Sequence, residues 1–66
     1  MPIIRIDMWE GRTLDQKRRL VAEVTAAVVD VLACEPSSVR ILIDEYPTSD
    51  WAVAGELVSD RDPPAG

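Results

Sequence analysis

The sequence predicts an α/β (α+β) fold built from one β-α-β unit with parallel strands. Three observations predict it. Residues 2–9 alternate in side-chain direction with the period of a strand, and residues 39–43 form a second short run rich in β-branched side chains. Between them, residues 13–35 repeat apolar side chains every three to four positions, which is the period of a helix. Because a helix crossover returns the chain to the same end of the sheet, the two strands should be parallel, with a right-handed connection.

The first strand, residues 2–9, places alternate side chains on opposite faces of the sheet. Ile4, Ile6 and Met8 point to one face, and Ile3, Arg5, Asp7 and Trp9 point to the other. Residues 10–12 follow as a turn, in which Gly11 is expected to take a special backbone angle.

The helix is expected to begin at Thr13, because Thr13 and Gln16 have the spacing of a capping box. Its apolar side chains are Leu20, Val21, Val24, Ala27, Val28, Val31 and Leu32. Arg19 stands four residues from both Asp15 and Glu23, so ion pairs are expected on the outer face. The sequence Glu35-Pro36 should end the helix, since the residue before a proline avoids helical backbone angles.

The C-terminal third is expected to contain little regular structure. The second strand fades at residues 44–45 and stops at Pro47. Residues 51–58 form either a short hairpin or an extended arm, and residues 60–66 read as a frayed tail. The whole chain, residues 1–66, is expected to be a single domain.

The size of the chain predicts self-association. A domain of 66 residues buries only about 60% of the surface that its unfolded chain exposes, and such domains usually need disulfides, a metal or partner subunits. With one cysteine, Cys34, and no histidine, neither an internal disulfide nor a zinc site is expected. One helix covers only one face of a two-stranded sheet, and the other face carries Ile3 and Leu42. We therefore expect copies of the chain to pair through their sheets.

Composition excludes several classes of function. The formal net charge of −5 argues against nucleic-acid binding, which needs a basic surface. The sequence has no run near the length of a membrane span and no secretory signal, so the expected compartment is the cytoplasm. Without histidine, the Ser-His-Asp and Cys-His catalytic arrangements are also excluded.

The residues best suited to chemistry are Pro2, Arg12 and Arg40. Removal of Met1 would leave Pro2 with a secondary amine, and an α-amino group has a pKa of about 7.7–8.0, which suits a general base near neutral pH. The alternative is that Pro2 only begins a strand. Arg40 lies inside an apolar run and is expected to pair with a carboxylate, which is either that of a ligand or Asp7, Asp44 or Glu45. For Arg12 the alternative is a solvated turn residue.

Other chemically capable side chains are expected to be structural. Residues 17–19 form a basic triplet that is expected to lie on a solvent-exposed face of the helix. Asp44 and Glu45 are neighbours in a strand, so their carboxylates point to opposite faces and do not converge on one substrate. Tyr46 and Cys34 are expected to have structural and not reactive roles. Trp9 and Trp51 are large apolar side chains beside turns, typical of a core or an interface, with the wall of a substrate pocket as the alternative.

In their order and spacing, these residues resemble the 4-oxalocrotonate tautomerase (2-hydroxymuconate tautomerase) family of the tautomerase superfamily. The resemblance runs from Pro2 to about Val58. Its markers are Met1-Pro2-Ile3-Ile4, Glu10-Gly11-Arg12, Asp15-Gln16-Lys17, Pro36-Ser37-Ser38-Val39-Arg40, Trp51 and Gly55-Glu56.

The resemblance implies a β-α-β fold with a short C-terminal hairpin, assembled as a homohexamer that is a trimer of dimers. It implies a cofactor-free and metal-free isomerase acting on a small anionic enol or dienol acid. Pro2 falls on the catalytic base of the family, and Arg12 and Arg40 fall on two substrate-binding arginines that come from neighbouring subunits. Trp51 falls on an aromatic pocket residue.

Three features of this chain depart from the family. Trp9 stands where the best-known family members carry a smaller aliphatic side chain that lines the site, so we expect a pocket that is either narrower or suited to a different ligand. Residues 52–54 read Ala-Val-Ala where more glycine is usual, and because alanine resists positive φ, the hairpin is expected to differ. Met1, if retained, would leave Pro2 with a non-basic amide nitrogen.

Two other functions remain open at this point. One is a different activity of the same superfamily, either tautomerisation of phenylpyruvate-type enols or hydration and dehalogenation of haloacrylates. The other is a non-catalytic oligomeric module, which retention of Met1 would favour.

Overall fold

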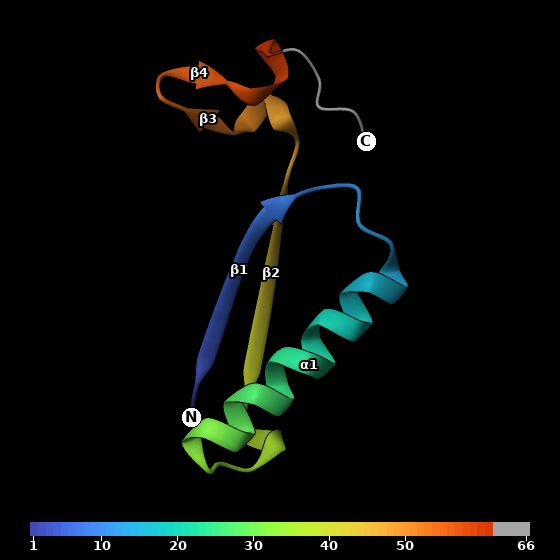
Figure 1. Ribbon diagram of the computed structural model, residues 1–66, viewed down its shortest axis with the longest axis vertical. Helices are drawn as coiled ribbons and strands as arrows, with labels where there is room; N and C mark the ends of the chain where they lie inside the picture. Colours follow the sequence, from blue (N-terminus) through green and yellow to red (C-terminus); the bar gives the residue numbers. More distant parts are fainter. Residues whose placement is uncertain (62–66) are drawn as a thin grey trace.

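The computed structural model describes residues 1–61 and has the predicted β-α-β order (Figure 1). Strand β1 (Ile3–Trp9), helix α1 (Leu14–Leu32) and strand β2 (Arg40–Tyr46) are followed by a hairpin of β3 (Ala52–Val53) and β4 (Glu56–Leu57). Short 3-10 turns cover Pro36–Ser38, Thr48–Asp50 and Val58–Asp60. β1 and β2 pair in parallel, from Ile3 opposite Arg40 to Trp9 opposite Tyr46. The predicted fold class is confirmed.

Helix α1 begins where the capping residues place it. The backbone N–H of Gln16 donates to Thr13 Oγ1 at 3.1 Å, and the backbone N–H of Thr13 donates to Gln16 Oε1 at 2.9 Å. The helix ends at Leu32, before the expected stop at Glu35-Pro36, because Ala33 takes a left-handed conformation with φ 53°. That conformation ends the ladder of helical hydrogen bonds, and Pro36 instead opens the next 3-10 turn.

The left-handed Ala33 makes a prediction about stability. The left-handed conformation costs an L-residue about 1–2 kcal/mol, a cost that glycine does not have. Ala33→Gly should therefore raise the free energy of unfolding by about 1 kcal/mol. The matched control is Ala26→Gly, an exposed position inside α1, where glycine should lower it by about 1 kcal/mol. Urea denaturation at one protein concentration measures both variants. Equal losses in the two would contradict the prediction.

The basic triplet does not form one solvated face. Arg18 pairs with Asp15 at 2.7 Å and Arg19 pairs with Glu23 at 3.4 Å, so the expected Asp15–Arg19 pair is absent from the described residues. Lys17 is half-buried and pairs with Glu45 of β2. Successive helical residues fan around the axis, so Lys17 points to the sheet while its two neighbours point outward. The interpretation of Lys17 as solvated was wrong.

The C-terminal residues form a hairpin and not an extended arm. Ala52 pairs with Leu57 and Val53 with Glu56, and the two residues between the strands have positive φ, 54° at Ala54 and 83° at Gly55. This is the backbone of a type I′ turn, whose twist matches that of the strands. Ala54 thus adopts the conformation that we expected alanine to resist.

Asp60 and Arg61, which we expected to begin a frayed tail, are held by contacts with preceding residues. Asp60 belongs to the 3-10 turn Val58–Asp60, in which Val58 is buried. The guanidinium of Arg61 donates to the carbonyl of Val53 at 3.2 Å and lies 3.6 Å from the Glu56 carboxylate. Arg61 therefore contacts both strands of the hairpin. The rest of the predicted tail, residues 62–66, lies outside the described residues.

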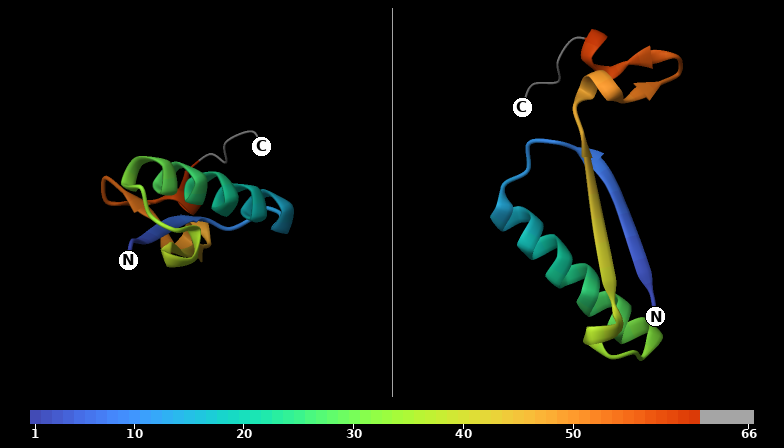
Figure 2. Two further views of the ribbon diagram at one scale, coloured as in Figure 1. Left: turned by 90° about the horizontal axis from the view of Figure 1, so that it is seen from below. Right: turned by 180° about the vertical axis from the view of Figure 1, so that it is seen from behind.

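A single chain covers only part of its apolar surface. The helix lies on one side of the sheet and leaves the other side open (Figure 2). Val58, 7% exposed, is the only buried hydrophobic residue among those described, while Ile3 and Leu42 on the open face are 62% and 51% exposed. The accessible surface is 5153 Å², against about 4,200 Å² for a compact monomer of this mass. The radius of gyration is 15.1 Å, against about 11 Å for a compact domain of this length.

Candidate active site

The structure distributes the five candidate site residues over the two ends of the sheet. Pro2 precedes β1, and its carbonyl accepts a hydrogen bond from the backbone N–H of Arg40 at 3.0 Å. Trp9, Arg12 and Trp51 lie toward the other end. Trp9 is seven positions after Pro2 along the strand, and at about 3.3 Å per residue the two are about 23 Å apart. One chain therefore brings Pro2 to Arg40 and Trp9 to Trp51, but does not unite the two groups.

Arg40 has no carboxylate partner among residues 1–61. Its guanidinium Nη1 donates to the carbonyl of Ser37 at 2.6 Å and lies 3.5 Å from that of Val39. The expected intrachain partners are engaged elsewhere: Asp44 with Arg5, Glu45 with Lys17, and Asp7 with Tyr46. The parallel register explains this, because Arg40 lies at the start of β2 while those carboxylates lie near the ends of the strands. Of the two readings of Arg40, an intrachain ion pair is excluded for the described residues.

Arg12 lies where the chain leaves β1 for the helix. Gly11 has φ 116°, a backbone angle that side-chain-bearing residues rarely adopt, and it turns the chain out of the strand. Arg12 then lines a hollow of about 210 Å³ together with Met8, Gln16, Lys17 and Leu20. Since Lys17 is paired with Glu45, Arg12 is the cation of this hollow without a carboxylate partner in the described part of the chain.

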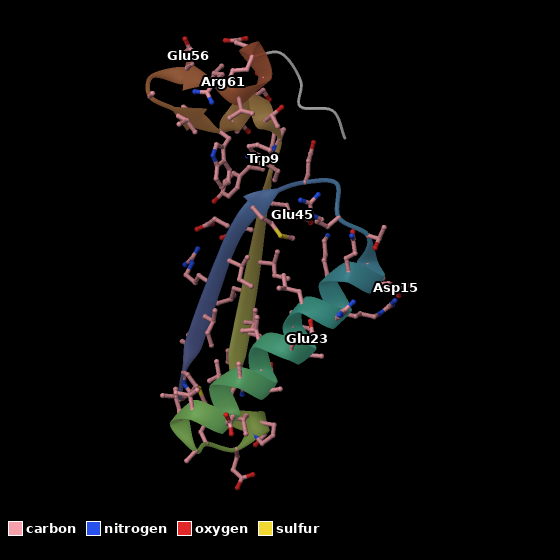
Figure 3. All side chains as sticks on the ribbon, in the orientation of Figure 1. Trp9, Asp15, Glu23, Glu45, Glu56 and Arg61 are labelled. Carbon is pink, nitrogen blue, oxygen red and sulfur yellow. The ribbon has the colours of Figure 1, made fainter. Side chains whose placement is uncertain are left out.

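Three aromatic rings gather where the sheet meets the hairpin, and Figure 3 labels one of them, Trp9, at this place. The ring of Trp51 lies 6.0 Å from that of Trp9 at 84°, and 6.0 Å from that of Tyr46 at 71°. Both are edge-to-face contacts, the favourable geometry for aromatic pairs. Trp9 Nε1 is buried without a hydrogen-bond partner among the described residues. This aromatic cluster (Trp9, Tyr46 and Trp51) closes the sheet at the end opposite Pro2.

The hydroxyl of Tyr46 donates to Asp7 Oδ1 at 3.2 Å, on the face of the sheet that the helix leaves open. The carboxylate of Asp7 raises the pKa of Tyr46 above its ordinary value of 10.0, first through this hydrogen bond and then through its charge. Asp7, Tyr46, Asp50, Trp51 and Ala52 line a hollow of about 220 Å³. The site therefore has an aromatic wall with carboxylates beside it.

Sequence reasoning missed the Asp7–Tyr46 pair. The alternation of β1 placed Asp7 and Trp9 on one face, but the partner of each residue depends on the register of the parallel strands. The structure sets Trp9 opposite Tyr46 and Asp7 opposite Asp44. Trp9 and Tyr46 are the last residues of their strands, so aligning the ends of the two strands could have suggested that they pair.

Among the described residues, no helix is long and apolar enough to cross a membrane. No group of three or more His, Cys, Asp or Glu side chains in residues 1–61 is arranged to hold a metal ion.

Comparison with known proteins identifies the family of the chain. The family described as tautomerase enzyme matches residues 2–61. The 2-hydroxymuconate tautomerase of Bacillus subtilis is 39% identical over 62 residues, which is 94% of this chain and 100% of that protein. The crystal structure of YwhB, a homologue of 4-oxalocrotonate tautomerase, superimposes with a TM-score of 0.89 at 38% identity, covering 92% of this chain and all of that one.

A heterohexamer 4-oxalocrotonate tautomerase from Chloroflexus aurantiacus superimposes with a TM-score of 0.86 at 33% identity. The match covers 91% of this chain and 97% of that one. Sequence and fold agree over nearly the full length of each relative, and the chain belongs to the tautomerase family, as a homologue of the 4-oxalocrotonate tautomerases.

Proposed function

We propose that this protein is a cofactor-independent tautomerase that moves a proton within an unsaturated 2-hydroxy or 2-oxo acid such as 2-hydroxymuconate. The amine of Pro2, freed by removal of Met1, is the general base. The observation that carries the proposal is the placement of Pro2: it is half-buried at the start of β1, bonded through its carbonyl to Arg40, while Met1 is 80% exposed. The name of the Bacillus subtilis relative supports the choice of substrate.

The proposed reaction needs no group beyond the side chains and the amine. The neutral secondary amine accepts a proton from the substrate, which becomes a delocalised enolate, and the ammonium then returns the proton to a different atom of the conjugated chain. Arg40 stabilises the negative charge as it develops on the oxygen, and Arg12 binds a distal carboxylate. The availability of both guanidinium groups for a carboxylate supports these roles.

The active site in this proposal lies between subunits of a homohexamer. The Pro2 and Arg12 ends of β1 are about 23 Å apart, too far for one small acid to contact both within a chain. A second copy lying antiparallel would bring its Arg12 and Trp51 beside the Pro2 of the first. The exposed Ile3 and Leu42 would be covered in such an assembly, and the heterohexameric neighbour supports it.

Subunit mixing tests both the function and its shared site. Pro2→Ala and Arg12→Gln should each have little activity alone. If every site takes Pro2 from one chain and Arg12 from another, an equimolar mixture after subunit exchange should regain up to about one quarter of the native activity. Ultraviolet absorbance of 2-hydroxymuconate measures turnover, and sedimentation shows that the mixture is assembled. A mixture no more active than the average of its two components would contradict the shared site.

A further inference from the structure

The ring of Trp51 is held by two aromatic side chains from different strands. Trp9 ends β1 and Tyr46 ends β2, and the two are register partners. Trp51 follows the 3-10 turn Thr48–Asp50 and contacts both rings edge to face. Figure 3 places Trp9 between the end of the sheet and the hairpin.

The backbone around Trp51 gives its side chain little support of its own. The N–H of Trp51 donates to the carbonyl of Thr48 at a long 3.4 Å, and its carbonyl accepts from Val58 at 2.8 Å. The strand that follows it is only two residues long. On one side the ring borders the open hollow of about 220 Å³. The orientation of the indole is therefore set by its aromatic neighbours and not by regular secondary structure.

Tyr46 is in turn fixed by Asp7. Its hydroxyl donates to Asp7 Oδ1 across the pair of strands, so the side chain cannot swing away from Trp51 about χ1 without losing that bond. The charged groups around the hydroxyl are Asp7 and Arg5 on β1 and Asp44 on β2, and Asp50 lines the same hollow. The net effect on Tyr46 is a raised pKa. The hydroxyl therefore stays protonated, and remains a donor to the Asp7 carboxylate, through the neutral range and up to a higher pH than an ordinary tyrosine.

We propose that Tyr46, held by Asp7, is a positioning residue that fixes the ring of Trp51 as a wall of the substrate site. Trp9 is the second contact that keeps the indole in this plane. The proposal rests on the proposed function only for the claim that substrate meets Trp51. The geometric claim, that the Asp7–Tyr46 pair holds the indole in place, does not depend on any activity of the protein.

The first experiment reads the geometry without turnover. The chain has two tryptophans, and two indoles 6.0 Å apart at 84° give an exciton-coupled circular dichroism signal. Tyr46→Phe should weaken this signal, because it removes the bond that anchors the ring of Tyr46. Asp7→Asn should weaken it less, because the amide oxygen still accepts from the hydroxyl but carries no charge. Trp9→Leu and Trp51→Leu each keep a single indole, so their spectra give the dichroism in the absence of the coupled pair. Asp44→Asn is the matched control, since Asp44 lies opposite Asp7 in the register but pairs with Arg5.

The second experiment separates substrate binding from chemistry. With 2-hydroxymuconate, Tyr46→Phe should raise KM about fivefold and Asp7→Asn should raise it by a smaller factor. Both should leave kcat within about twofold, the size expected for a loosened aromatic contact. The native signal should also decline above pH 10, where Tyr46 ionises, and Tyr46→Phe should show no such step. Signal and KM unchanged from those of Asp44→Asn would overturn the proposal. If the native protein lacks turnover, the proposed function fails, and the dichroism still decides whether Tyr46 positions Trp51.

Discussion

A chain that keeps a residue in front of Pro2 is expected to lose about 10²- to 10⁴-fold in kcat, the range that a positioned general base contributes. The nitrogen of Pro2 is then part of an amide, and its lone pair is delocalised into the carbonyl group, so it cannot accept a proton. Intact mass identifies the amino terminus of each sample. Ultraviolet absorbance of 2-hydroxymuconate measures its turnover.

The control uses one chain in two states. An amino-terminal extension that a protease removes directly before Pro2 gives an inactive and an active form with the same fold. Pro2→Ala adds a second comparison, since it keeps a free amine but replaces the secondary amine by a primary one. Full turnover by a sample whose mass includes Met1 would show that the amine of Pro2 is not the base.

Arg40→Gln is expected to lower kcat by about 10²- to 10³-fold, the effect of removing one preorganised donor to a developing oxyanion. Arg40 already has its guanidinium beside the carbonyls of Ser37 and Val39 and no carboxylate partner within residues 1–61. Replacing Arg40 should therefore change the stability of the fold little, but it should destabilise the transition state strongly. Initial rates across a range of substrate concentrations separate kcat from KM.

Arg5→Gln is the matched control for Arg40. Arg5 lies on the same face of the sheet, in the neighbouring strand, and its exposed ion pair with Asp44 at 3.0 Å is of a kind that contributes about 0–1 kcal/mol to stability. Its replacement should leave kcat within about twofold, as expected for an arginine outside the chemistry. Equal losses in Arg5→Gln and Arg40→Gln would point to a general effect of positive charge on an acidic protein, and would contradict a specific role for Arg40.

Local features of the fold could be read from the sequence because they depend on residues a few positions apart. The Thr13–Gln16 capping box and the positive φ of Gly11 are of this kind, and both are present. The prediction of where α1 ends was wrong, although it too depends on residues a few positions apart. A left-handed Ala33 is costly on local grounds, so the proline at position 36 was the stronger signal in the sequence.

Contacts between distant residues could not be read in this way. The basic triplet looked uniform, yet Lys17 alone faces β2 and pairs with Glu45. Tyr46 looked structural, yet its hydroxyl bonds Asp7 and its ring contacts Trp51. Each contact depends on the register of the strands or on the angle at which the helix crosses them. A single register step would exchange the face of every side chain in a strand.

The sequence by itself determined the β-α-β order, the shortage of core and the chemical groups available at the site, because composition, periodicity and short-range spacing are properties of the chain alone. The resemblance of its motifs to known tautomerases indicated the family, and comparison confirmed it. Only the tertiary structure decided that Pro2 and Arg40 share one end of the sheet while Trp9 and Trp51 meet at the other. The physical reason is the parallel pairing of β1 and β2, whose register fixes which side chains meet and keeps the two ends apart.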